Sequence, residues 1–216
     1  MNYIVIDMEY NQNFDFAIGA KAPSNPFLPL EIIQIGAVKV DARLDIVAKY
    51  SSCVCPRVYP RLNPFVAKVT GLSNKTLQKS PYFAQAFAEL ANFVGRGKSV
   101  LCFWGKDDMK ELFRNILYFK QKPKLLPRKY INVQSLASVH LNLPAKQQLN
   151  LASVVNFLEI EATLPFHDAP NDAFYTAQIF KRIYNEEKPN MLYFDLGQLI
   201  QHNKKLETGA AYDGDK

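Results

Sequence analysis

Hydrophobic and polar positions along the chain follow two periods, one typical of strands and one typical of helices. The apolar run from Tyr3 to Asp7 is too short for a helix and predicts a buried strand, and Glu31 to Val40 and Leu44 to Cys55 are also strand-like. Residues 82–95 and Asn171 to Tyr184 instead carry apolar residues at helical spacing, which predicts amphipathic helices. Leading strands followed by alternating helices and strands predict an α/β fold, with a mixed five-stranded sheet flanked by helices.

The segments between these elements set the expected domain limits. Residues 11–30 are rich in Asn, Gly, Pro and Ser and predict a loop, while Ser73 is the expected N-cap of a short helix over 73–78. Residues 189–201 predict a last packed helix. From His202 the chain is polar, so we expect one domain over 1–201 and a flexible tail over 202–216.

Composition and charge narrow the class of protein. The chain has 216 residues, of which 48% are hydrophobic and 21% charged, as in an ordinary soluble domain. No stretch approaches the roughly 20 apolar residues of a membrane helix, and the N-terminus lacks the basic region of a signal peptide. Three cysteines argue against a disulfide framework and favour a cytoplasmic location. The net charge of +6 favours polyanionic partners, although many basic proteins never bind nucleic acid.

Two acidic residues end the first predicted strand. Asp7 and Glu9 are two positions apart, so in a strand their side chains project to the same face. Two carboxylates at a sheet end are suited to a hard divalent cation, which takes oxygen ligands. The alternative is a pair of solvated acids where a strand meets a loop.

A histidine and an aspartate precede the clearest predicted helix. His167 lies in the loop before it and Asp172 lies in its first turn, five residues later. A histidine near neutral pKa is suited to accept a proton from water beside a metal ion. The alternatives are a loop histidine and an acid that stabilises the helix dipole.

Taken in order, the motifs resemble those of the DEDDh exonucleases, the family of the DnaQ proofreading subunit. Asp7-Met8-Glu9 resembles the first exonuclease motif, and the run from Glu31 to Ala37 resembles the family's second strand. Val69-Thr70-Gly71-Leu72 is similar to its TGI turn, the run from Trp104 to Met109 resembles the second motif, and His167 to Asp172 resembles the third. The resemblance runs from residue 3 to about 185 and implies a ribonuclease H-like fold.

The second motif contains two adjacent acids, Asp107 and Asp108. In the family the aspartate lies three residues after the glycine and just before an apolar residue, which selects Asp108 and turns Met109 into the core. The Trp-Gly-x-x-Asp-Met form is most similar to the branch that holds KapD and the exonucleases that trim histone messenger and small interfering RNAs. Many members have Thr after the motif's Glu, whereas this chain has Tyr10.

The resemblance implies a two-metal 3′→5′ exonuclease that releases nucleoside 5′-monophosphates from single-stranded RNA or DNA ends. The implied cofactors are two Mg²⁺ or Mn²⁺ ions, because the ligand set is all oxygen. As in relatives, Asp7 would bridge both ions, Glu9 and Asp172 would complete the water-activating site, and Asp108 would hold the other ion. His167 would be the general base.

Substrate contacts are expected from residues near the first motif. Met8, Tyr10 and Phe14 are close enough in sequence to stack on or wedge against bases, with core packing as the alternative, above all for Phe14. Lys21 and the pair Lys106 and Lys110 are candidates for phosphate contacts, with ordinary solvated lysines as the alternative.

Three other functions are compatible with parts of the sequence. One is a nucleic-acid-binding or regulatory module that keeps the fold but has little turnover, and the presence of all five residue types argues against it. Another is a different metal-dependent nuclease or nucleotidyl enzyme on the same architecture, which the His-x4-Asp element disfavours. A purely structural basic protein leaves the order of the motifs unexplained. The sequence does not distinguish RNA from DNA, and protein partners stay unknown.

Overall fold

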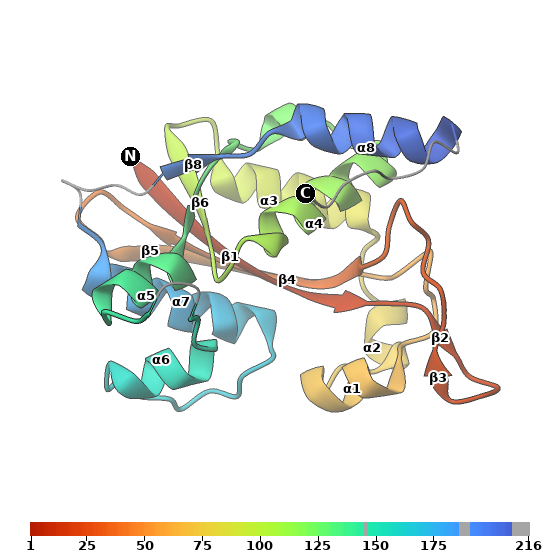
Figure 1. Cartoon of the computed structure of the whole chain (residues 1–216), viewed down its shortest axis with the longest axis horizontal. Coiled ribbons are helices and arrows are strands. Elements are labelled where there is room, and N and C mark those ends of the chain that lie inside the picture. The colour runs from red at the N-terminus through yellow and green to blue at the C-terminus, as the bar shows by residue number, and fades with distance from the viewer. Residues whose placement is uncertain (145–146, 186–190, 209–216) are drawn as a thin grey trace.

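A six-stranded mixed sheet in the order β5-β4-β1-β6-β7-β8 forms the centre of the computed structural model, which describes residues 1–144, 147–185 and 191–208 (Figure 1). The strands are β1 Asn2–Asn11, β4 Glu31–Val40, β5 Ile46–Cys53, β6 Ser99–Phe103, β7 Lys129–Asn132 and β8 Met191–Tyr193. β1 pairs antiparallel with β4 and parallel with β6. The predicted α/β class and mixed sheet are confirmed, but the sheet has six strands where five were expected, since three residues are too few to show a period.

Helices cover both faces of this sheet (Figure 1). They are α1 Pro64–Thr70, α2 Asn74–Gln78, α3 Phe83–Val94, α4 Asp107–Tyr118, α5 Val133–His140, α6 Leu151–Phe157, α7 Ala169–Ile183 and α8 Leu196–Thr208, with a 3-10 turn at Pro123–Leu125. α3, α4 and α8 enclose one hydrophobic core, and α5, α6 and α7 enclose a second on the opposite face. The predicted N-cap Ser73 is confirmed, because its side chain accepts the backbone N–H of Thr76. No helix in the described ranges is long and apolar enough to cross a membrane.

The alternation of side chains along β1 decides which residues reach which face. Ile4 and Ile6 are fully buried in the core beneath α3 and α4, whereas Tyr3 and Val5 are buried beneath α7. Because successive side chains of a strand alternate, Asp7 continues the set that faces α7. Burial of the first half of β1 on both faces therefore fixes the direction of the acid at its end.

Two segments differ from the sequence prediction. The expected loop over 11–30 contains a small hairpin, with β2 Phe14–Asp15 paired to β3 Ala20–Lys21, and two-residue strands leave no periodic signal. The last predicted helix, over 189–201, is also wrong in its limits.

At the C-terminal end, the described part of the chain forms β8 before α8 begins at Leu196. α8 continues to Thr208, so the helix extends over residues 202–208, beyond its predicted end at 201. Half-buried His202, Asn203 and Leu206 explain the difference, since the polar sequence conceals an inward face. Residues 189–190 and 209–216 of these predictions lie outside the described residues.

Candidate active site

The end of β1 brings two carboxylates over the face that α7 covers. Asp7 is paired with Gly36 and Glu9 with Gln34 on the antiparallel neighbour β4. The register shifts between Glu9 and Tyr10, so the strand carries an irregularity directly after the second acid. Such bulges re-aim side chains, and here the bulge lies between a carboxylate and the residue that contacts Asp108.

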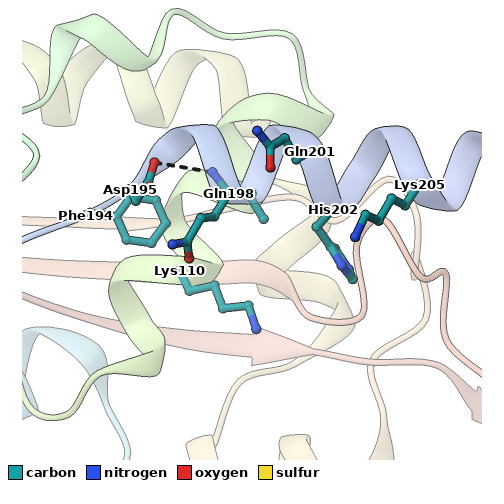
Figure 2. A pocket seen from close by; sticks show the side chains of 8 residues that line it. Lys110, Phe194, Asp195, Gln198, Gln201, His202 and Lys205 are labelled. Carbon is teal, nitrogen blue, oxygen red and sulfur yellow. Dashed lines mark hydrogen bonds between the residues drawn. The ribbon is translucent and has the colours of Figure 1, made fainter. Parts of the chain in front are cut away.

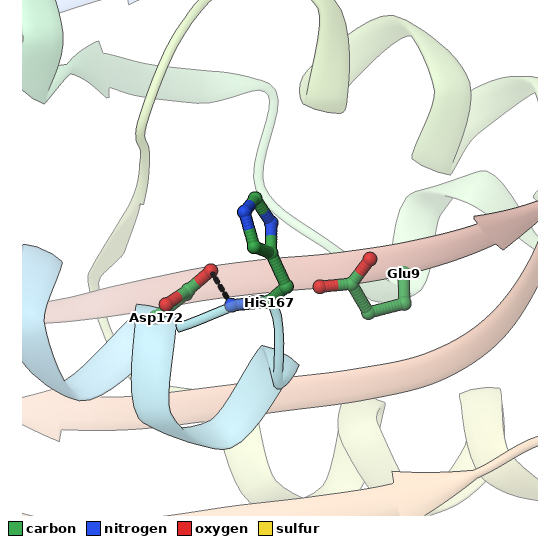
Figure 3. A group of neighbouring side chains, drawn as sticks. All are labelled: Glu9, His167 and Asp172. Carbon is green, nitrogen blue, oxygen red and sulfur yellow. Dashed lines mark hydrogen bonds between the residues drawn. The ribbon is translucent and has the colours of Figure 1, made fainter. Parts of the chain in front are cut away.

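The start of α7 supplies Asp172 and the preceding loop supplies His167. The backbone N–H of His167 donates to Oδ2 of Asp172 over 3.0 Å, which ties the loop to the first helical turn. Ligand atoms of Glu9, His167 and Asp172 all lie within 4.8 Å of one another (Figure 3). His167 has a φ of 62°, in the left-handed region that non-glycine residues rarely adopt. This backbone conformation holds an exposed imidazole beside two carboxylates.

α7 reaches this position because β4 leaves room for it. A Cβ built on Gly36 would lie 2.2 Å from the carbonyl carbon and oxygen of Ala169, a distance that real side chains never show. The Gln34 side chain then holds the helix start, donating to Asp168 over 2.7 Å and accepting the N–H of Ala169 over 3.1 Å. Close packing and these two hydrogen bonds therefore set the distance between Asp172 and β1.

The fourth carboxylate, Asp108, lies in the first turn of α4. The hydroxyl of Tyr10 donates to its Oδ1 over 3.0 Å. Asp107 is exposed, whereas Met109 is fully buried in the core of the α3–α4 face, as the sequence predicted. The structure thus directs Asp108 rather than Asp107 toward the end of β1.

The acids raise one another's pKa values. Burial raises the pKa of Asp7 well above its ordinary value, and the nearby Asp108, Asp172 and Glu9 raise it further. Burial, followed by the charges of Asp172, Asp168 and Asp108, raises the pKa of Glu9 to about 7. The structure therefore brings all four predicted acids into one electrostatic cluster.

The acids contributed by the two helices follow the same pattern. Burial raises the pKa of Asp108 to about 6, against the lowering effect of the Tyr10 hydrogen bond. Burial also raises the pKa of Asp172 to about 6, while the His167 amide and imidazole lower it. Opposing charge is what such a cluster requires, because like charges in a partly buried site destabilise one another.

The donor set fits divalent cations. Asp172 is only 8% exposed, and its buried Oδ1 has no hydrogen-bond partner among the described residues. A buried acceptor without a partner is costly unless another group, such as a cation, satisfies it. Carboxylate oxygens are the ligands preferred by Mg²⁺ and Mn²⁺. Asp7, Glu9, Asp108 and Asp172 are the residues that would hold them.

Two of the predicted substrate contacts, Met8 and Phe14, pack against other apolar side chains. Met8 is only 4% exposed and packs in the core, because its side chain points to the opposite face from Asp7. Phe14 lies in β2, where its ring packs edge-on against Phe16 with centroids 5.0 Å apart. Tyr10, the third, contacts Asp108 through its hydroxyl.

Sequence reasoning missed an exposed aromatic residue near the end of β1. Phe65 in α1 is 68% exposed, and α1 begins where Asn63 N–H donates to Oδ1 of the fully buried Asn11. The Asn11 amide also donates to the carbonyls of Tyr59 and Arg61, so the end of β1 is bonded to the segment that leads into α1. Phe65 lies five residues before the turn at Thr70-Gly71, and an apolar residue on an amphipathic helix gives no sign that it faces solvent.

Comparison with known proteins identifies the family. The exonuclease family RNase_T matches residues 24–180, a range that begins after Asp7 and Glu9 and includes Asp108, His167 and Asp172. The DNA polymerase III subunit epsilon of Aquifex aeolicus (strain VF5) is 26% identical over 180 residues, covering 83% of this chain and 82% of the relative.

Solved structures share the fold. The nuclease domain of 3′hExo, a DEDDh family member bound to rAMP, superposes with a TM-score of 0.71 at 20% identity, over 90% of this chain and 96% of that one. An Escherichia coli ExoI–ssDNA complex in its zinc-bound form superposes with a TM-score of 0.64 at 15% identity, over 98% of this chain and 45% of that one.

The chain therefore belongs to the RNase_T exonuclease family, and it shares the fold of the exonuclease structures that it resembles. It is a nuclease with the ribonuclease H-like architecture, and its family implies dependence on divalent metal.

Proposed function

We propose that this protein hydrolyses single-stranded nucleic acid stepwise from the 3′ end and releases nucleoside 5′-monophosphates. The observation that carries the proposal is the convergence of four carboxylates and His167 from β1, α4, α7 and the loop before α7. Phosphodiester hydrolysis requires an activated water, charge relief at the phosphoryl oxygens and help for the leaving oxygen. Mg²⁺ or Mn²⁺, when bound, would neutralise charge and lower the pKa of water.

His167 is the proposed general base. Its imidazole is exposed, lies within 4.8 Å of the ligand atoms of Glu9 and Asp172, and is held by a left-handed backbone conformation. An imidazole in this position can accept the proton of the attacking water. Backbone strain of this kind is a feature of functional sites and supports the assignment.

The terminal base is proposed to stack on Phe65. Its exposed ring is carried by the helix bonded to the end of β1, and bases stack on aromatic faces with little sequence preference. Tyr10 fits this role less well, because its hydroxyl is engaged by Asp108. The chain's structural neighbours include a 3′-exonuclease that recognises a histone mRNA stem-loop, a nuclease domain bound to rAMP and an exonuclease bound to single-stranded DNA, so both sugars are substrates to be tested.

A gel assay tests the direction and substrate class. RNA and DNA oligonucleotides of one sequence, labelled at the 5′ end, are incubated with Mg²⁺ or Mn²⁺, with EDTA, and with the Asp172→Asn variant. A ladder that shortens one nucleotide at a time, and that disappears with EDTA and in the variant, is the expected result. The same strand labelled at the 3′ end should release labelled mononucleotide at once.

The competing function is a nucleic-acid-binding or regulatory module with little turnover. Binding of the same oligonucleotides without shortening under either metal would favour that module and contradict the exonuclease. Fragments produced by cleavage of internal bonds would also contradict the exonuclease.

A further inference from the structure

A groove with an excess of positive charge lies between α4 and α8, apart from the carboxylate cluster. It encloses a cavity of about 270 Å³ and is lined mainly by Lys110, Phe194, Gln198, Gln201, His202 and Lys205. Figure 2 shows Lys110 extending from α4 below α8, on the side of α8 from which His202 and Lys205 project. Its lining therefore combines two ammonium groups, an imidazole and two amides.

The cavity lining carries two lysines and one acid, so its ammonium groups outnumber its carboxylates. Within the described ranges neither Lys110 nor Lys205 forms an ion pair. Asp195, the acid that also lines the cavity, accepts the backbone N–H groups of Gly197 and Gln198 at the start of α8. On the α4 side, Glu111 is paired with Arg114.

The neighbouring cations affect the pKa of His202, as expected for an electropositive cluster. Burial lowers the pKa of His202, and the charges of Arg114, Lys110 and Lys205 lower it further. An excess of cations attracts anions, and lysines that contact phosphates gain affinity through counterion release.

The helix that carries Asp108, α4, also contributes Lys110 to the lining of the groove. Lys110 follows Asp108 by two residues, which in a helix places the two side chains on nearly opposite sides at a Cα separation of about 5–6 Å. Asp108 faces the end of β1, whereas Lys110 faces α8. A strand that leaves the carboxylate cluster past the start of α4 would thus meet the groove within a few nucleotides.

We propose that the α4–α8 groove binds backbone phosphates of the single strand upstream of the nucleotide that is removed. Lys110 and Lys205 would contact phosphate oxygens, and the amides of Gln198 and Gln201 would accept or donate hydrogen bonds to sugar or base. The inference rests on the proposed function, and it adds a second site that sets how strongly longer substrates bind. Hydrolysis of the terminal bond itself does not require it.

The test compares long and short substrates in the Lys110→Ala/Lys205→Ala variant. Both lysines are exposed, so the change leaves the core intact. The matched control is Lys98→Ala/Lys129→Ala, which removes the same charge from the amino ends of β6 and β7, at the opposite end of those strands from Asp108. The affinity for fluorescent 12-mers is measured by anisotropy in Ca²⁺ at several salt concentrations. Turnover is measured on 12-mers, dinucleotides and the p-nitrophenyl ester of a nucleoside 5′-monophosphate.

The groove variant should bind the 12-mer several-fold more weakly than the control variant. Its slope of log Kd against log salt should fall by roughly 1.4, about 0.7 for each lost phosphate contact on a single strand. Hydrolysis of the dinucleotide and the ester should stay within two-fold of wild type.

Equal loss on the ester, equal weakening by both lysine pairs, or unchanged binding of the 12-mer would each overturn the inference. A glutamate oligomer that displaced the 12-mer as well as an unlabelled oligonucleotide does would also overturn it, in favour of an acidic peptide. Failure of the wild type to hydrolyse any substrate would instead remove the proposed function. The anisotropy comparison would still report on the groove, so the two claims fail separately.

Discussion

The hydroxyl of Tyr10 donates a 3.0 Å hydrogen bond to Oδ1 of Asp108, joining the end of β1 to the first turn of α4. The pKa of Tyr10 is raised well above its ordinary value by burial and by the charge of Asp108, so the phenol stays protonated and acts as a donor. The family resemblance leads one to expect a threonine at this position, whereas the tyrosine in this chain holds a carboxylate. Tyr10 is therefore a positioning residue in this chain.

Removal of this hydrogen bond should change the pH dependence of the enzyme. In Tyr10→Phe the pKa of Asp108, already raised to about 6, should rise further by roughly one unit, because a hydrogen bond to an ionised group stabilises the charged form. The acidic limb of the profile of kcat/KM against pH should move to higher pH, with a greater loss at pH 6 than at pH 8. Tyr82→Phe, at an exposed tyrosine, is the control. A uniform loss at every pH would indicate a merely structural role.

Gly36→Ala should displace α7 and with it Asp172. Its Cβ would meet the Ala169 backbone at 2.2 Å, and overpacking of this kind costs about 1–3 kcal/mol. A misplacement of about 1 Å at a catalytic site can lower the rate about 100-fold, which is the expected loss in kcat. Gly97→Ala is the matched control, since its Cβ would meet open space. A Gly36→Ala variant with the activity and melting temperature of the wild type would contradict the proposed role of Gly36 in positioning α7.

His167→Asn removes the imidazole and should leave the conformation of its loop unchanged. Asparagine tolerates the left-handed conformation that His167 adopts at φ 62°, so the loop should be preserved. Loss of a general base should lower kcat about 10²–10⁴-fold while the melting temperature stays unchanged. His140→Asn, at the exposed end of α5, should remain active. More than half of the wild-type kcat in His167→Asn would exclude the histidine as the base.

Without metal, the carboxylate cluster should make stability fall as pH rises. The pKa values of Glu9, Asp108 and Asp172 are raised to about 7, 6 and 6, so the folded protein binds more protons than the unfolded chain between about pH 4 and pH 7. This contribution to the free energy of unfolding is favourable at the acidic end of the window and is lost above it.

Thermal unfolding in EDTA from pH 5 to pH 8 measures this effect. The melting temperature should fall across the range relative to Asp7→Asn, which should be the more stable by a few degrees at pH 8 because one buried charge is gone. Mn²⁺ should stabilise the wild type at pH 8 and the variant less. A wild type that gains stability relative to the variant as pH rises would contradict the electrostatic account.

Much of the fold and the acid positions could be predicted because they follow from short-range periodicity. Asp7 and Glu9 are two positions apart, so in a strand they lie on the same face. The apolar residues at helical spacing after Asn171 place Asp172 in the first turn of α7. The same alternation places Met8 opposite Asp7, in the core, which agrees with the core packing that the sequence left open as its alternative.

What could not be predicted depends on contacts between distant segments. In the sequence, Gln34 and Gly36 are two ordinary residues of a predicted strand. Their role depends on α7, which lies against Gly36 and follows much later in the chain, since Gln34 and its partner Asp168 are 134 residues apart. The Tyr10–Asp108 bond spans 98 residues and likewise leaves no periodic signal. The second half of α8, over residues 202–208, was not predicted because its inward face rests on a few residues within a polar sequence.

Digestion in H₂¹⁸O tests the central claim most directly. A single-stranded oligonucleotide is incubated with the wild type and Mg²⁺ or Mn²⁺ in labelled water, and the products are analysed by mass spectrometry. The account predicts nucleoside 5′-monophosphates with one ¹⁸O in the phosphate, together with shortened strands that keep an unlabelled 3′-hydroxyl. Mononucleotides with 3′-phosphates, label retained on the remaining strand, or intact oligonucleotide under both metals would contradict it.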